Sequence, residues 1–129
     1  MKTLRVGIAS YAEMKARTLA IVRGEIKKAP SEPTVWFSSA ESFARVLSAR
    51  NRGLLQVIAE SAPGSLAELA QLTGRAKSNL SRTLKTLERY GLVTLTRGAR
   101  GRLVAEVPYR AVTLAVPLTL RVRTKRAVA

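Results

Sequence analysis

The chain of 129 residues contains no cysteine, no histidine and no aspartate. These absences exclude thiolate nucleophiles, imidazole bases, disulfides and the common cysteine and histidine zinc sites. All eight acidic residues are glutamates, and they lack the paired spacing of catalytic carboxylates or of a usual magnesium site. No Walker or dinucleotide-binding glycine motif is present either. We therefore expect a protein that is not an enzyme and that uses no cofactor or metal.

Long hydrophobic runs are also missing. No apolar run approaches the roughly 18 residues of a membrane span, and the N-terminus lacks the continuous apolar stretch of a signal peptide. The basic, amphipathic segment 2–23 is compatible with an organelle transit peptide, but Glu13 and the scarcity of serine argue against that interpretation. We expect no membrane contact and a cytoplasmic location. The length and the 47% hydrophobic content suit one compact domain with appendages.

Positive charge is in large excess, since 23 lysines and arginines against eight glutamates give a formal net charge of +15. The excess is concentrated between residues 75 and 102, where Glu88 is the only carboxylate. Such a concentration attracts a polyanion from beyond contact distance, and the phosphate backbone of nucleic acid is the obvious candidate. Charge alone is also compatible with a solvated face or a membrane-binding face, so this hypothesis needs a structural motif beside it.

A helical pattern interrupted by a glycine runs through residues 65–90. Ser65, followed three residues later by Glu68, predicts a capping box at the start of a first helix. Gly74 predicts a left-handed C-cap, after which the chain reverses and begins a second helix at a steep angle. The expected buried positions of the first helix are Leu66, Leu69, Ala70 and Leu72.

The second helix has two faces of different chemistry. At about 3.6 residues per turn, one stripe carries Ala76, Leu80, Leu84 and Leu87, and the opposite stripe carries Ser78, Arg82, Lys85 and Arg89. One face is expected to pack and the other to bind, as in a helix that enters a DNA groove. Gly91 is expected to end this helix.

A hairpin is predicted directly after that helix. Apolar residues alternate with threonines from residue 92 to residue 96, and residues 103–107 predict the returning strand. The expected tip is a flexible glycine loop that carries Arg97, Arg100 and Arg102. The order helix, turn, helix, hairpin is that of a winged helix.

The pattern LAQLTGRAKSNLSRTLKTLERYGLV, residues 69–93, followed by a basic hairpin resembles the winged helix-turn-helix regulators of the MarR type. The upstream run TVWFSSAESFARVLSARNRGLL, residues 34–55, is similar to small predicted prokaryotic DNA-binding proteins, some of which look like antitoxins encoded beside toxin genes. The MarR-type family usually has serine, threonine or aspartate where this chain has Ala76, so Ser78 is an alternative cap of the second helix.

The predicted fold class is α+β, mainly α, with a winged helix-turn-helix and short strand extensions at both ends. We divide the chain into an N-terminal strand-helix extension and linker (1–38), the winged helix-turn-helix domain (39–108), and a C-terminal strand and basic tail (109–129). In the first part, alternation at residues 4–8 predicts a strand, helical spacing at residues 11–22 a helix, and residues 27–33 a linker. Residues 35–37 predict a second short strand, with Trp36 and Phe37 in the core rather than stacked on bases.

Two further helices are expected before the motif. Ser38 or Ser39 is expected to cap one with Phe43, Val46 and Leu47 on its apolar side. The next helix is expected to bury the apolar residues between positions 54 and 58.

A long strand is predicted after Pro108, with alternating apolar residues from Val112 to Val122. Pro117 places it at a sheet edge or at a break between two strands. The terminal strands and the N-terminal helix either form the interface of a homodimer or cover the core of their own subunit.

The function predicted from these features is sequence-specific binding of duplex DNA by a transcriptional regulator. The face that enters the major groove carries Lys77, Ser78, Asn79, Ser81, Arg82 and Lys85. Arginine and asparagine have the bidentate geometry for guanine and adenine edges, so Arg82 and Asn79 are the candidate base readers, although Asn79 lies toward the side of the stripe and alternatively packs or contacts phosphate. Further contacts to the DNA backbone or minor groove are expected from Arg50, Arg52, Arg89, Arg97, Arg100 and Arg102.

Two other hypotheses remain open. The chain is alternatively an antitoxin, whose terminal elements cover a partner toxin while the winged helix regulates the operon. RNA binding is the third hypothesis, although the few aromatic residues do not show the spacing of a base-stacking surface.

Overall fold

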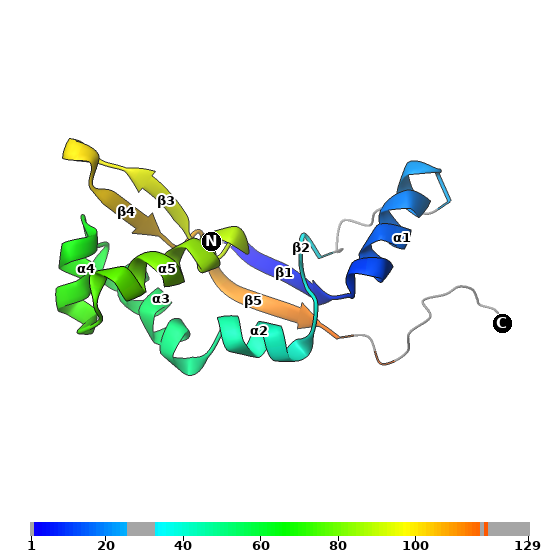
Figure 1. Cartoon of the computed structure of the whole chain (residues 1–129), viewed down its shortest axis with the longest axis horizontal. Coiled ribbons are helices and arrows are strands. Elements are labelled where there is room, and N and C mark those ends of the chain that lie inside the picture. The colour runs from blue at the N-terminus through cyan, green and yellow to red at the C-terminus, as the bar shows by residue number, and fades with distance from the viewer. Residues whose placement is uncertain (1, 26–32, 117, 119–129) are drawn as a thin grey trace.

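The computed structural model describes residues 2–25, 33–116 and 118. The chain has an α+β fold, which Figure 1 shows from its broad side. In chain order the elements are β1 (Lys2–Ile8), α1 (Tyr11–Val22), β2 (Val35–Phe37), α2 (Ala40–Val46), α3 (Ala49–Ser61), α4 (Leu66–Thr73), α5 (Lys77–Arg89), β3 (Thr94–Arg97), β4 (Leu103–Glu106) and β5 (Tyr109–Ala115). Most of the predicted linker and the chain beyond residue 118 lie outside the described residues, as does Pro117.

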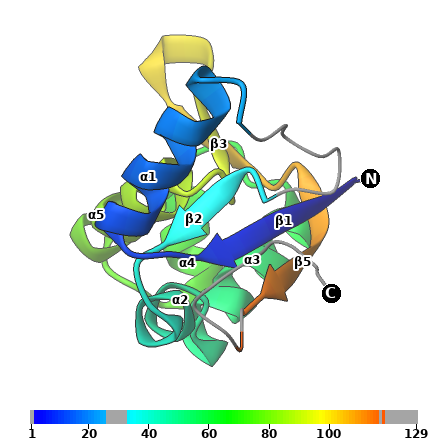
Figure 2. The ribbon, with the colours of Figure 1, turned by 90° about the vertical axis from the view of Figure 1, so that its right-hand side faces the viewer.

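The two ends of the described chain meet in one sheet of order β2-β1-β5, in which all strands are parallel. Leu4 pairs with Val112 and Val6 with Leu114, so the inward-facing apolar residues of β1 and β5 stand side by side. Helices α2 to α5 lie behind this sheet in Figure 2. The terminal strands therefore cover the core of their own subunit, which was one of the two interpretations, and β5 lies at an edge of the sheet.

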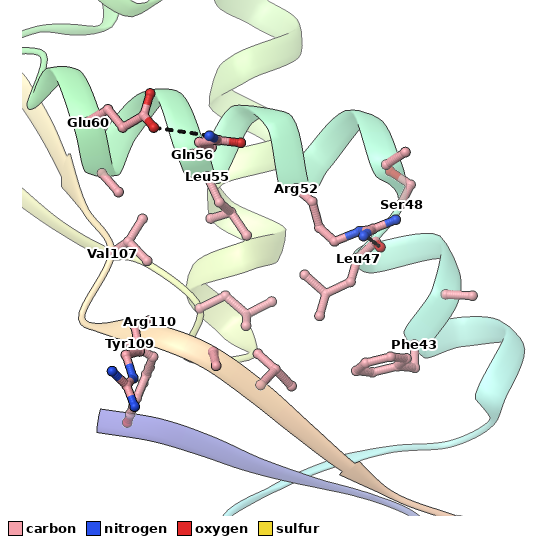
Figure 3. A pocket seen from close by; sticks show the side chains of 16 residues that line it. Phe43, Leu47, Ser48, Arg52, Leu55, Gln56, Glu60, Val107, Tyr109 and Arg110 are labelled. Carbon is pink, nitrogen blue, oxygen red and sulfur yellow. Dashed lines mark hydrogen bonds between the residues drawn. The ribbon is translucent and has the colours of Figure 1, made fainter. Parts of the chain in front are cut away.

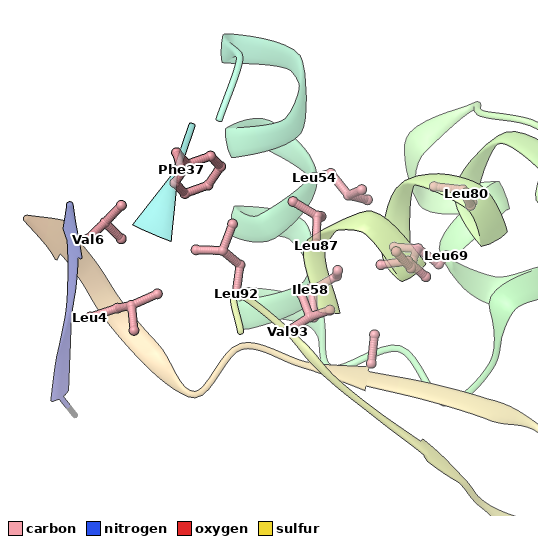
Figure 4. Packing of buried hydrophobic residues seen from close by; sticks show 12 residues of the cluster. Leu4, Val6, Phe37, Leu54, Ile58, Leu69, Leu80, Leu87, Leu92 and Val93 are labelled. Atoms are coloured by element: carbon pink, nitrogen blue, oxygen red, sulfur yellow. The ribbon is translucent and has the colours of Figure 1, made fainter. Parts of the chain in front are cut away.

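One hydrophobic cluster joins the sheet to the helices (Figure 4). Its buried members come from the first two segments of the predicted division of the chain: Leu4, Val6, Phe37, Leu54, Ile58, Leu69, Leu80, Leu84, Leu87, Leu92, Val93 and Ala105. The third segment adds the partly buried Tyr109, Val112 and Leu114. The ring of Phe37 stacks on Tyr90 at 4.1 Å and meets the edge of Phe43 at 5.3 Å. The prediction that Phe37 belongs to the core is confirmed, but Trp36, which was expected beside it in the core, is only half-buried and lies outside the cluster.

Serine side chains begin most of the helices. The hydroxyl of Ser39 accepts a hydrogen bond from the N–H of Ser42, so Ser39 rather than Ser38 caps α2. Ser65 likewise caps α4, but the carboxylate of Glu68 accepts from the N–H of Gly64 rather than from Ser65. The predicted capping box at Ser65 is therefore only half formed.

A complete capping box begins α1, where the sequence analysis did not predict one. The backbone N–H of Ser10 donates to Oε1 of Glu13 at 2.7 Å, and the backbone N–H of Glu13 donates to Oγ of Ser10 at 3.1 Å. Hydrogen bonding by the backbone of Ser10, and to a smaller extent by its side chain, lowers the pKa of the Glu13 carboxyl group. Both residues are exposed, and the box stabilises the start of α1 locally.

A prediction about the burial of α4 is wrong, and α1 does not cover the core. Leu72 was expected in the core but is 48% exposed, because the buried side of α4 is centred on Leu69 and Thr73 takes the position expected for Leu72. Helix α1 forms as predicted, yet none of its residues is buried. Tyr11 and Val22 are 78% and 77% exposed.

Among the described helices, none combines the length and the apolar character that crossing a membrane requires.

We predict that Gly7→Ala destabilises the sheet. A Cβ atom at Gly7 would lie 2.5 Å from Cζ3 of Trp36 and 2.9 Å from Cγ of Pro33, so β1 and β2 would have to separate. Overpacking of this kind lowers the free energy of unfolding by about 1–3 kcal/mol, which urea denaturation measures. The matched control is Gly53→Ala within α3, where nothing lies within 4 Å of the added atom. The free energy of unfolding of Gly53→Ala should rise by about 0.5–1 kcal/mol. Equal effects of the two substitutions would contradict the close packing of Gly7 against Trp36.

Candidate functional site

Helices α4 and α5 are joined by a tight turn at Gly74, whose φ of +74° is the left-handed conformation that the sequence predicted. Helix α5 begins at Lys77, and its N-cap Ala76 has extended backbone angles and no side-chain cap. Ala76 is exposed and lies outside the helix, so its expected place on the buried stripe was wrong. Ser78 is inside the helix and is not the cap, because the first helical hydrogen bond already joins the N–H of Leu80 to the carbonyl of Ala76 at 2.9 Å.

The predicted division of α5 into two faces is confirmed. Leu80, Leu84 and Leu87 are at most 1% exposed. On the opposite side the exposed residues are Ser78, Arg82, Lys85 and Arg89. Lys77 is exposed at the start of the helix, while Asn79 and Ser81 are half-buried along its flanks. In the described part of the chain, the side chains of Arg82, Lys85 and Arg89 make no hydrogen bond or ion pair with another protein group.

The predicted hairpin follows directly. Strands β3 and β4 pair antiparallel with Arg97 opposite Leu103, and Arg97, Arg100 and Arg102 are all exposed. The tip is more tightly closed than the flexible loop that we expected. A short 3₁₀ turn spans Ala99–Gly101, the N–H of Gly98 donates to the carbonyl of Arg102 at 2.7 Å, and the guanidinium of Arg97 donates to the carbonyl of Gly101 at 3.0 Å.

Arg75 is a residue whose role the sequence analysis missed, since it assigned Arg75 only to the turn. Its Nε donates to Oδ1 of Asn79 at 2.9 Å, and its Nη2 donates to Oγ1 of Thr83 at 3.2 Å. Its Nη1 is buried without a hydrogen-bond partner among the described residues. Burial and then the positive charge of Arg50 lower the pKa of Arg75. The spacing of residues 75, 79 and 83 at intervals of four was the available signal.

Of the two arginines expected to add phosphate contacts, Arg50 lies close enough to Arg75 to contribute to lowering its pKa. Arg52 instead donates from Nε to the carbonyl of Leu47 at 3.2 Å and borders an apolar groove of about 820 Å³ (Figure 3). The groove lies between α2, α3 and the start of β5. No sequence pattern indicated it, because its lining residues are scattered between positions 43 and 112.

Figure 1 places the hairpin and α1 at opposite ends of the molecule. Gly91, whose φ of +78° ends α5 as predicted, lies in the sequence between the exposed cations of α5 and those of the hairpin. The exposed apolar residues of α1 are therefore separate from the hairpin with its three arginines.

The HVO_A0114 family model matches residues 46–114, slightly more than half of the chain. The matched segment runs from the last residue of α2 to the penultimate residue of β5, and it includes every predicted contact residue. No curated protein and no solved structure shows detectable similarity to the chain.

The uncapped start of α5 gives a prediction that separates the two candidate cap positions. Ala76→Ser supplies an oxygen for the N–H of Asn79 and should raise the free energy of unfolding by about 1 kcal/mol, measured by urea denaturation. Ser78→Ala, the matched control, should change it by less than about 0.5 kcal/mol because Ser78 caps nothing and is exposed. A larger loss for Ser78→Ala than the gain for Ala76→Ser would mean that the helix starts two residues later.

Proposed function

The chain belongs to the HVO_A0114 family, and we propose that it is a winged helix-turn-helix transcriptional regulator that binds duplex DNA. Helices α4 and α5 are the helix-turn-helix, α5 is the recognition helix, and the β3–β4 hairpin is the wing. The observation that carries this proposal is the combination of a fully buried leucine stripe on α5 with an exposed basic face on its opposite side. The resemblance of residues 69–93 to MarR-type regulators supports the same assignment.

In this proposal the exposed face of α5 lies in the major groove. Arg82 is at the centre of that face and reads a base edge, for which a guanidinium matches the O6 and N7 atoms of guanine. Lys77, Ser78, Ser81, Lys85 and Arg89 surround it and contact phosphates. The three arginines of the wing contact the backbone or the adjacent minor groove.

Such regulators usually bind as dimers, because one recognition helix covers too short a site for tight binding. With β1 and β5 paired to each other, α1 is the remaining predicted interface element. Its exposed Tyr11, Leu19 and Val22 give a homodimer an apolar surface.

A second candidate function rests on those same residues of α1. An antitoxin needs a surface for its toxin that leaves the DNA-binding face accessible, and α1 lies at the opposite end from the wing (Figure 1). Purification of this chain with the product of an adjacent toxin-like gene distinguishes the two roles. A complex that Tyr11→Glu disrupts without loss of DNA binding supports the antitoxin, while recovery of this chain alone supports a regulator without that partner.

RNA binding has less support. Recognition of single-stranded RNA uses exposed aromatic rings, but Phe37 is 1% exposed and its ring packs against Tyr90 and Phe43. Competition between duplex DNA and a structured RNA for the purified chain decides between the two nucleic acids.

We predict that Arg82→Ala weakens binding to the preferred duplex far more than binding to random duplex. Loss of a bidentate base contact costs about 1–3 kcal/mol and relaxes the preference at that base pair. The preferred duplex is first selected from a randomised pool, and affinities are then measured by fluorescence anisotropy. Arg45→Ala, in the last turn of α2, removes the same charge from an exposed position outside the proposed DNA contacts and outside α1, and it should leave both affinities nearly unchanged. Equal losses for Arg82→Ala on the two duplexes would exclude Arg82 as a base reader.

The wing gives a different expectation. Arg100→Ala should lower the affinity for preferred and random duplexes alike and should reduce the slope of log affinity against log salt by about one. Titrations at several salt concentrations test this. An unchanged slope would show that Arg100 does not contact phosphate.

A further inference from the structure

Arg75 holds the side-chain amide of Asn79 in one orientation. The guanidinium lies along the flank of α5, donating from Nε to Oδ1 of Asn79 at 2.9 Å and from Nη2 to Oγ1 of Thr83 at 3.2 Å. The backbone N–H of Arg75 also donates to Oγ1 of Thr73 at 3.3 Å, which ties the same residue to the end of α4.

The chemistry of the two groups determines which way the amide points. A guanidinium has five N–H donors and no acceptor, so only the carbonyl oxygen of Asn79 can face it. The oxygen and nitrogen of a side-chain amide are ordinarily hard to distinguish, but in Asn79 the hydrogen bond from Arg75 identifies the oxygen. The Nδ2 group is left on the side away from Arg75, so Asn79 presents donors and not its acceptor to a ligand.

This orientation changes what Asn79 is able to recognise. Bidentate recognition of adenine needs an acceptor for N6–H₂ and a donor for N7, both turned toward the base. A donor-only amide suits the neighbouring O6 and N7 acceptors of guanine, or O4 of thymine, and it opposes the amino groups of adenine and cytosine.

We propose that Arg75 is a positioning residue that makes Asn79 a reader of guanine or thymine instead of adenine. The inference rests on the proposed function, because it concerns the base pair that lies beside α5. It replaces the expectation from residue type alone, which paired Asn79 with adenine. Arg75 acts through Asn79 and does not itself touch the base.

The test selects duplexes from a randomised pool with the purified chain, with four single variants and with one double variant. Asn79→Ala identifies the base pair that depends on Asn79. Arg75→Met removes the guanidinium, and Thr83→Val removes its second anchor. Arg50→Met is the matched control, since it removes a neighbouring positive charge that has no hydrogen bond to Asn79.

The wild-type chain should select guanine or thymine at the position that Asn79→Ala relaxes. Arg75→Met should raise the ratio of adenine to guanine there by about fivefold or more, because the freed amide turns its oxygen outward. Thr83→Val should shift the ratio in the same direction by a smaller factor. Arg50→Met should weaken binding to all sequences without changing the ratio, and the double variant Arg75→Met/Asn79→Ala should show no preference at this position.

Three outcomes overturn the inference while the proposed function stands. They are a wild-type preference for adenine at this position, an unchanged ratio in Arg75→Met and Thr83→Val, and an Asn79→Ala variant that selects the wild-type sequence at every position. If Arg75→Met does not fold by circular dichroism, Thr83→Val and the wild-type preference decide the question. Failure of the wild-type chain to select any sequence instead refutes sequence-specific DNA binding itself.

Discussion

Burial of the leucine stripe of α5 is the contact on which the rest of the structure depends. Leu80, Leu84 and Leu87 belong to the same cluster as Ile58 of α3 and Leu69 of α4 (Figure 4), and each buried leucine contributes roughly 1.5–3 kcal/mol. Because a helix is a rigid rod, burying one side determines the direction of every other side chain on it. The outward orientation of the cations is thus a consequence of apolar packing.

The parallel sheet connects both ends of the described chain to that core and leaves surfaces uncovered. Parallel sheets are normally covered on both faces, yet here the helices of the core lie on one face, and Arg5 and Thr113 are exposed (Figure 2). Helix α1 connects β1 to β2, but it contributes no buried residue. No residue of α5 lines the apolar groove.

The flank of α5 differs from its centre in a way that matters for recognition. Arg82 is at the centre, exposed and without protein partners in the described residues, so its conformation is set by what it binds. Asn79 is half-buried and hydrogen-bonded to Arg75, so its conformation is set in advance. The proposed base-reading surface would combine an adaptable contact with a preorganised one, and the preorganised contact would lose less conformational entropy on binding.

The sequence by itself determined the features that depend on near neighbours along the chain. Ser65 and Gly74 predicted the ends of α4, and leucine spacing predicted both faces of α5, because capping and helical periodicity are local properties. The tertiary structure decided that β1 pairs with β5, that Leu72 is exposed, and that a groove lies beside α3. These outcomes depend on how separate elements meet in space, and residue order alone does not specify that arrangement.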